Sequence, residues 1–385
     1  MTTPNTNLSS TPSQSEFIQS TLIATASGHK IAHLTLNNPK LLNAQNLEMV
    51  RTMRVLFDAW AADDDVVMVL LTGSGERAFC AGGDIKSLHA HGIDEQDLAS
   101  ADKDGLLAEK IQLAKEFFIH EYGTMYAMHT YPKPIVAWGN GVVMGGGLGL
   151  LAASSHKVVT NSTLMAMPEV SIGLFPDAGG SYFLNHMLGK VGLFLGLTGA
   201  RFTGADALHL GLADAFCAHD DFDALLATLC QADWQATKND AHALVSKVLQ
   251  QYHRAYPPSQ VLSALDEINR LMNAGDLLAV DSALQNYTGD DAWIKAAIDS
   301  YRQGSATTKA LTWRIFHALR TTKKGVALSE IFKMEECVAT QCVVRGDFKE
   351  GVRALLIDKD KNPKWRYTLQ NLPDEYLAQF FENGW

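Results

Sequence analysis

Cysteine, positive charge and long apolar runs are all scarce in this 385-residue sequence. The five cysteines are odd in number and form no CxxC pair, which argues against a disulfide framework or a zinc site. Lys and Arg number 32 against 42 Asp and Glu, and a net charge of −10 disfavours a broad basic face. The longest apolar run, residues 66–71, is too short to span a bilayer. We therefore expect neither nucleic acid nor a membrane as a partner.

The N-terminal segment lacks the features of a targeting sequence. Residues 1–15 are mostly Ser, Thr, Asn, Pro and Gln, which predicts a disordered tail. The segment has no apolar stretch of the kind found in secretory signals, and no Arg or Lys precedes Lys30. Together with cysteines that form no disulfide framework, this predicts a cytoplasmic protein.

Strands and helices alternate over residues 16–216. Residues 31–36 alternate apolar and polar side chains as a half-buried strand does, and residues 66–71 have the composition of a fully buried strand. Between them, Val50, Met53, Leu56 and Phe57 recur at helical spacing over residues 46–61. Further strands are predicted over residues 134–138, 157–160 and 164–167. This alternation predicts a mainly parallel α/β domain.

The pattern changes after about residue 216. From residue 221 to residue 354 only helical periodicity is present, for example at Leu311, Ile315, Ala318 and Leu319. The sequence therefore predicts an α/β domain over residues 16–216, followed by an all-helical region over residues 217–385.

Two glycine-rich turns, residues 78–85 and 144–149, follow predicted strands. A glycine turn that opens a helix exposes backbone N–H groups, which suit a phosphate or an oxyanion forming on a carbonyl. Neither the turn after residue 138 nor the one at 145–150 completes a GxGxxG motif, and GxxxxGK[ST] and GxSxG are absent. Taken alone, each turn is equally consistent with close packing of a helix on a strand.

A third cluster, residues 167–180, holds two acids in apolar surroundings. Glu169 follows Pro168 at the end of an apolar strand, and Asp177 lies between Pro176 and a glycine pair. An acid in such a segment is costly to bury unless it is paired or used in chemistry. The alternatives are a helix-capping role for Asp177 and a buried ion pair for Glu169.

Together, the three clusters resemble the crotonase (enoyl-CoA hydratase/isomerase) superfamily over residues 16–216. Within it, residues 165–180 (MAMPEVSIGLFPDAGG), 192–199 and 347–365 are similar to the 3-hydroxyisobutyryl-CoA hydrolase group. The resemblance implies an α/β fold with a crotonase-like ββα spiral core and a long all-helical C-terminal region. It also implies an acyl-CoA thioester as substrate.

The resemblance assigns catalytic roles residue by residue. It implies an oxyanion hole formed by the N–H groups of Gly83 and Gly146, with Glu169 and Asp177 as catalytic acids. Glu169 would act as a general base or attack directly to give an anhydride, and both routes stay open. Asp177 would orient the water or hold a substrate hydroxyl. Glu121 would line the acyl pocket, the alternative being a solvated acid on a helix face.

The resemblance also implies a bent CoA whose adenine lies near the backbone of residues 81–84. The implied CoA-binding residues are Lys40, Ala81, Gly83, Asp84 and Lys86. The two lysines would contact phosphates, although a solvated surface lysine is an equally good interpretation for each. CoA belongs to the substrate, so no separate cofactor is expected. No metal is expected either, because His89 and His91 are too close in sequence to share a helical face.

The informative departure from the hydratases is Gly149. Hydratases of the superfamily carry a second glutamate at this position and a glycine where this sequence has Asp177. The change implies hydrolysis of a short branched β-hydroxyacyl-CoA, 3-hydroxyisobutyryl-CoA plus water giving 3-hydroxyisobutyrate and CoA, as in valine breakdown. The alternatives are an enoyl-CoA hydratase/isomerase and a non-catalytic acyl-CoA-binding protein. The C-terminal helices would cover the protein's own active site, and self-association is left open.

Overall fold

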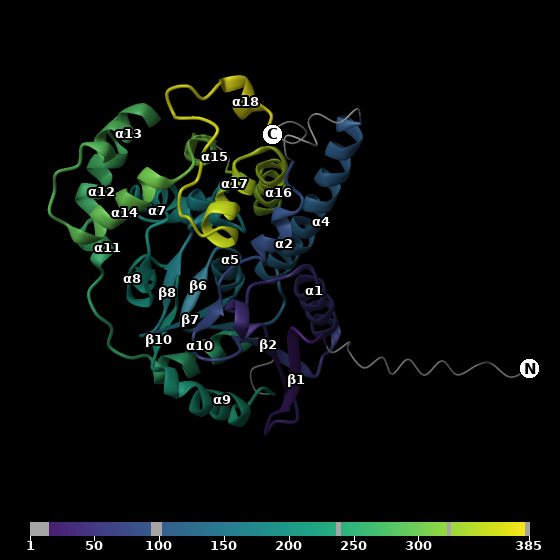
Figure 1. Ribbon diagram of the computed structural model, residues 1–385. Helices are drawn as coiled ribbons and strands as arrows, with labels where there is room; N and C mark the ends of the chain where they lie inside the picture. Colours follow the sequence, from purple (N-terminus) through teal and green to yellow (C-terminus); the bar gives the residue numbers. More distant parts are fainter. Residues whose placement is uncertain (1–14, 94–101, 236–239, 322–324, 382–385) are drawn as a thin grey trace, which may run out of the picture.

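A computed structural model describes residues 15–93, 102–235, 240–321 and 325–381 (Figure 1). Of the tail predicted over residues 1–15, all but Ser15 lies outside the described residues. The described chain forms two β-sheets with intervening helices and then a long helical region, so the predicted α/β fold with a helical C-terminal region is confirmed.

The first sheet has the strand order β1-β2-β3-β5-β7-β10. Its strands are β1 (Ile18–Ala24), β2 (Lys30–Leu36), β3 (Val66–Gly73), β5 (Ile135–Gly139), β7 (His156–Thr160) and β10 (Ala215–Cys217). Only β1 runs antiparallel to its neighbour, and the pairs from β2 to β10 are parallel. In the central strand β3, Met68, Leu70 and Leu71 are fully buried, as a parallel strand covered on both faces requires.

The second sheet is smaller and has the order β4-β6-β8-β9. Its strands are β4 (Ala78–Cys80), β6 (Val142–Met144), β8 (Leu164–Ala166) and β9 (Phe202–Thr203). The strands β4, β6 and β8 are parallel, and β9 is antiparallel to β8. The segments that follow β4, β6 and β8 therefore leave the same edge of the sheet, and all three sequence clusters lie there.

Helices connect and cover the strands. In the first part of the chain they are α1 (Leu47–Ala62), α2 (Ile85–His89), α4 (Lys103–His129), α5 (Gly146–Ala153), α6 (Gly180–Phe183), α7 (Val191–Thr198) and α8 (Gly204–His209), with the 3-10 turns η1 (Pro39–Leu41), η2 (Glu169–Ile172) and η3 (Leu184–His186). The predicted helix over residues 46–61 is α1. Asn46 caps it by accepting a hydrogen bond from the amide of Met49, and its apolar stripe is buried.

The C-terminal part of the described chain is helical, as predicted. It comprises η4 (His219–Asp221), α9 (Phe222–Gln231), α10 (Ala241–Tyr252), α11 (Gln260–Ser263), α12 (Leu265–Met272), α13 (Leu277–Gln285), α14 (Ala292–Gln303), α15 (Ala306–Thr321), α16 (Leu328–Arg345), α17 (Phe348–Val352), the π-helical turn η5 (Arg353–Ile357) and α18 (Asp374–Ala378). The predicted boundary at 216/217 stays a prediction, since β10 crosses it and both parts share one core.

The helical region packs on two sides of the strands (Figure 1). Helices α9 and α10 cover one face of the first sheet, where Leu225 and Val245 pack with Met68 and Trp138 in a separate hydrophobic cluster. Helix α16 instead packs along the long helix α4. This second contact brings the C-terminal region to the edge of the small sheet where the three clusters lie.

Candidate active site

Two of the glycine turns contact each other at the edge of the small sheet. Gly82 follows β4, and Gly145 lies between β6 and α5; their φ angles are +112° and +52°. A Cβ built on Gly82 would lie 3.5 Å from the amide nitrogen of Gly146 and 3.8 Å from the Cα of Gly145. Glycine permits both the positive φ and the close approach of the two backbones.

The amides assigned to the oxyanion hole are available for a ligand. Within the described residues, neither the N–H of Gly83 nor that of Gly146 donates a hydrogen bond to a protein acceptor. Gly146 is the first residue of α5, where helix geometry leaves N–H groups without intrahelical partners and gives them a positive electrostatic environment. The two amides come from adjacent backbone segments, and their role in an oxyanion hole stays a prediction.

Glu169 lies beside these amides at the start of η2. Its side chain is buried, with 4% of the residue exposed, and Oε2 has no hydrogen-bond partner among the described residues. Oε1 lies 2.9 Å from the position of a Cβ built on Gly145. Burial raises the pKa of Glu169 well above its ordinary value, and the charges of Asp177 and Glu121 raise it further. A buried carboxyl group that has one oxygen without a partner is better suited to proton transfer than to a structural ion pair.

Asp177 is the second buried acid, with 5% of the residue exposed. The hydroxyl of Tyr122, on α4, donates a short hydrogen bond to its Oδ2 atom. Burial raises the pKa of Asp177 to about 6, while the Tyr122 hydrogen bond opposes that rise. Asp177 does not cap the following helix by a side-chain hydrogen bond.

Glu121 is buried rather than solvated, with 3% of the residue exposed. It lies on α4 and accepts a hydrogen bond of 3.3 Å from the side-chain amide of Gln45. A Cβ built on Gly146 would collide with Oε1 of Glu121 and lie 3.0 Å from Nε2 of Gln45. Burial raises the pKa of Glu121 well above its ordinary value, with Asp177 and Glu335 adding to the effect.

Gly149 is packed too tightly for any side chain. A Cβ at this position would lie 2.5 Å from the carbonyl oxygen of Ala178 and 2.9 Å from Sδ of Met125. The turn that carries Asp177 therefore occupies the space next to residue 149. In this protein the second acid comes from that turn, and helix α5 contributes backbone only.

Sequence analysis missed three residues of the site: Gln45, Tyr122 and Glu335. Glu335 lies on α16 and is fully buried. It accepts hydrogen bonds from the amides of Gly179 (2.7 Å) and Ser181 (3.1 Å) and from the Ser181 hydroxyl. Burial raises the pKa of Glu335 to about 8. The sequence feature that could have identified Glu335 is its position as an acid among the buried apolar residues of a predicted helix, next to Met334.

The residues assigned to CoA lie at the surface beside this cluster. Lys40 in η1 and Lys86 in α2 are exposed. The amide of Ala81 donates to the carbonyl of Leu42, which joins the first glycine turn to the segment of Lys40. Asp84 caps α2 by accepting hydrogen bonds from the amide and hydroxyl of Ser87. The contacts of these residues and of Gly83 with CoA stay predictions.

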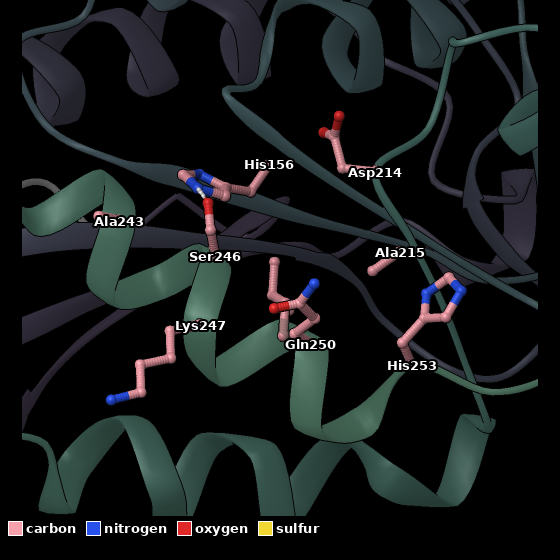
Figure 2. Close-up of a pocket in the computed structure, with 9 residues that line it drawn as sticks. His156, Asp214, Ala215, Ala243, Ser246, Lys247, Gln250 and His253 are labelled. Atoms are coloured by element: carbon pink, nitrogen blue, oxygen red, sulfur yellow. Dashed lines mark hydrogen bonds between the residues drawn. The ribbon is translucent and has the colours of Figure 1, made fainter.

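A cavity of about 610 Å³ lies elsewhere, between β7, β10 and α10 (Figure 2). His156 Nε2 lies 3.0 Å from Ser246 Oγ, the interaction drawn in Figure 2. Asp214 accepts from the backbone amide of Lys157 and pairs with its ammonium at 2.9 Å. These polar groups form hydrogen bonds and ion pairs with one another. The cavity is lined by none of the clustered acids, Glu121, Glu169, Asp177 and Glu335. The chemistry is therefore assigned to the edge of the small sheet.

The described part of the chain offers neither a metal site nor a membrane span. No group of three or more His, Cys, Asp or Glu residues there is arranged to hold a metal ion. None of its helices combines the length and the apolar character needed to cross a membrane.

The sequence matches the family model for enoyl-CoA hydratase/isomerase over residues 31–381. It is 37% identical to the mitochondrial 3-hydroxyisobutyryl-CoA hydrolase of Danio rerio, over 92% of this chain and 87% of that protein. It is 36% identical to 3-hydroxyisobutyryl-CoA hydrolase 1 of Arabidopsis thaliana (91% and 88%) and to the mitochondrial enzyme of Rattus norvegicus (91% and 86%).

Two solved structures resemble the whole fold. A crystal structure described as an enoyl-CoA hydratase from Rhodobacter sphaeroides has a TM-score of 0.77 and 30% identity, covering 94% of this chain and 97% of that one. One described as a carnitinyl-CoA dehydratase from Mycobacterium thermoresistibile has a TM-score of 0.76 and 32% identity, covering 94% and 96%.

The relatives correct the predicted location. A cytoplasmic protein was expected, but the similar proteins of zebrafish, frog and rat are named mitochondrial, so that prediction is wrong. The expectation rested on composition and on the absence of a recognisable import segment. A folded domain with free cysteines and an acidic surface is compatible with either compartment, so those features carried no information on this point.

Proposed function

Because this chain belongs to the 3-hydroxyisobutyryl-CoA hydrolase group of the enoyl-CoA hydratase/isomerase family, we propose that it hydrolyses 3-hydroxyisobutyryl-CoA to 3-hydroxyisobutyrate and CoA. In this reaction, water adds to the thioester carbonyl carbon and the C–S bond breaks. The site must therefore stabilise an oxyanion, remove a proton from water and return a proton to the leaving thiolate.

The observation that carries this proposal is the position of the acids around Gly149. Addition of water to a double bond in this family uses a second glutamate at that position. Here the Ala178 carbonyl occupies the space that any side chain of residue 149 would need. The second acid is Asp177, one residue before Ala178, and it is fixed by the hydroxyl of Tyr122. This exchange of acids favours chemistry at the carbonyl carbon.

The thioester oxygen would bind between the amides of Gly83 and Gly146. Support for this comes from their adjacent backbones and from the lack of any protein acceptor for either N–H in the described residues. Preorganised amides stabilise the tetrahedral intermediate because they need no reorientation as charge develops, and one such donor is worth about 3–4 kcal/mol of barrier.

Glu169 would take the proton from the attacking water. Its Oε2 atom has no hydrogen-bond partner among the residues that the structure describes, and its raised pKa makes the ionised form a strong base. Asp177 would orient the water, and Glu121 would form a hydrogen bond with the β-hydroxyl of the substrate. The same Glu169 oxygen could instead attack directly, and single turnover in ¹⁸O-water distinguishes the routes, because only an anhydride places ¹⁸O in Glu169.

A hydratase is the second candidate, favoured by the description of the solved structure from Rhodobacter sphaeroides. A panel of acyl-CoA esters separates the two functions. We expect free thiol to appear with 3-hydroxyisobutyryl-CoA and no loss of enoyl absorbance with crotonyl-CoA. Rapid loss of crotonyl-CoA absorbance without thiol release would overturn the proposal. Binding of the esters without turnover of either kind would do the same.

A further inference from the structure

A second polar cavity, of about 410 Å³, lies in the helical region. Its walls come from α13, α14, the start of α15 and the loop of residues 365–370. The side chains that matter here are Asp281, Arg302, Lys309, Trp365 and Tyr367. None of the clustered acids lines this cavity.

Lys309 is a buried cation without an acceptor. Only 5% of the residue is exposed, and no hydrogen bond or ion pair of its ammonium occurs within the described residues. Its Nζ atom lies 4.1 Å from the centre of the Tyr301 ring. Asp281 lines the same cavity but accepts its hydrogen bond from the Tyr301 hydroxyl, at 3.0 Å. A buried ammonium is costly unless an anion or solvent compensates it.

Burial lowers the pKa of Lys309 to about 8, an effect that Asp281 partly opposes. The group is therefore still mainly protonated at neutral pH. The cavity thus contains a positive charge for which the described residues supply an aromatic face and a nearby carboxylate, but no direct ion pair.

The N-terminus of α15 opens onto the same cavity. Gly304 and Ala306, both in the lining, flank Ser305, whose hydroxyl caps the helix by accepting from the amide of Thr308 at 3.1 Å. In the described residues, the amides of Ala306 and Thr307 donate to no protein acceptor. The start of this 16-residue helix therefore adds the N–H of the lining residue Ala306 and the positive end of the helix dipole, which is partly offset by the buried carboxylate of Asp347 that accepts from the Ser305 hydroxyl at 2.6 Å.

We propose that this cavity binds a small anion with phosphate or carboxylate chemistry, held by the Lys309 ammonium and the amide end of α15. Arg302 adds positive charge at the rim, although it is already paired with Asp299 at 3.0 Å. Trp365 forms a fixed wall, because its indole N–H donates to the carbonyl of Gln303 at 2.8 Å. The carboxylate of Asp281 opposes the anion and limits its charge and affinity.

This site is independent of the proposed hydrolysis. The two regions are in contact: the Ser305 amide donates a hydrogen bond of 3.0 Å to the carbonyl of Val170, the residue after Glu169. Loss of the anion site would leave the hydrolase proposal intact, and failure of the hydrolase proposal would leave the anion site intact.

The test is a calorimetric titration of the full chain with inorganic phosphate, and a titration with chloride at equal ionic strength is the reference. Excess CoA is present in both titrations, so that phosphate cannot bind where the phosphates of CoA would bind. Wild type should bind phosphate, and Lys309→Met should bind it at least tenfold more weakly. Lys295→Met is the matched control, because this exposed lysine on α14 lies outside the cavity lining and pairs with Asp290 at 3.5 Å. It should bind phosphate like the wild type.

Asp281→Asn provides a second test that leaves Lys309 in place. Removing the opposing carboxylate should tighten phosphate binding several-fold, while the amide oxygen still accepts from the Tyr301 hydroxyl. Equal phosphate affinity in wild type and a folded Lys309→Met variant would overturn the proposal. The proposal would also be overturned if phosphate gave the wild type no more heat than chloride does, or if Asp281→Asn bound phosphate more weakly than the wild type.

Discussion

The hydroxyl of Tyr122 donates a hydrogen bond to Oδ2 of Asp177, a residue 55 positions later in the chain. This bond connects the middle of α4 to the turn that supplies the second acid. Because the phenol donates to the ionised form, it holds the pKa of Asp177 near 6 despite complete burial. The pKa of the acid that we propose as the second catalytic group thus depends on a residue outside the recognised motifs.

Tyr122→Phe should move the pH dependence of hydrolysis. Without the hydroxyl, the pKa of Asp177 rises above about 6, so the loss of kcat/KM on acidification begins at higher pH than in the wild type. The measurement is thiol release as a function of pH on both sides of that value. Tyr126→Phe, at a more exposed position of the same helix, is the control and should keep the wild-type profile. An unchanged acid limb in Tyr122→Phe would show that Asp177 need not be ionised.

Glu169→Gln should lower kcat for thiol release by about 10²- to 10⁴-fold, the usual contribution of a positioned general base. Gln has a similar shape, so the buried position next to Gly145 stays filled and the fold is retained. The control is Glu116→Gln, a partly exposed acid of α4 that pairs with Arg51. Steady-state kinetics and circular dichroism on both variants check the result. Wild-type turnover in Glu169→Gln would exclude both the base and the anhydride route.

Gly149→Ala should destabilise the protein and reduce its activity. The added methyl group would meet the Ala178 carbonyl at 2.5 Å, and overpacking of this kind costs about 1–3 kcal/mol. Relief of the clash displaces the turn of Asp177. Gly123→Ala, inside helix α4, is the matched control. A Cβ added at Gly123 would lie 3.9 Å from Nη1 of Arg54, an ordinary contact distance. That variant should gain about 0.5–1 kcal/mol in urea unfolding. Equal stability of the two variants would contradict this packing argument.

Glu335→Gln should lower activity through the geometry of the Asp177 turn. Both carboxylate oxygens of Glu335 accept backbone amides, and Gln leaves one of them, at Gly179 or Ser181, without an acceptor. A lost acceptor at a buried amide costs about 1–3 kcal/mol. The control is Glu336→Gln, whose partly exposed acid pairs with Lys115 at 3.3 Å.

The pH dependence of stability gives a second readout for Glu335. Its pKa is about 8 in the folded protein against an ordinary 4.5, so between these values the folded state binds the proton more tightly than the unfolded state. The free energy of unfolding of the wild type therefore falls as pH rises through this window. Glu335→Gln lacks this contribution, so its deficit relative to wild type should shrink with rising pH. A deficit that grows with pH would contradict the assignment.

Much of the catalytic domain was predictable from short-range patterns. The strands near residues 31–36 and 66–71 and helix α1 follow from apolar periodicity, because each buries one continuous face or both faces. Glu169 and Asp177 were identifiable because acids in apolar segments are unusual, and the structure buries both. Strand β1 was missed because it is an edge strand whose residues are mostly exposed.

The partners of the acids were not predictable in the same way. Glu335 contacts Gly179 across 156 positions, and Gln45 contacts Glu121 across 76. Such contacts follow from how helices pack, and helical periodicity gives the buried face of α16 but not the element it packs against. The location in the cell was missed for a different reason, since composition does not report it.

The hydrogen bonds from Gly179 and Ser181 to Glu335 also impose an order of events during synthesis. A nascent polypeptide translated only through the second sheet already contains every glycine turn, Glu169 and Asp177. It lacks the Glu335 side chain, which binds the backbone of the turn directly after Asp177, because that residue belongs to α16. A product released before α16 is synthesised would therefore carry both acids without this support for the turn.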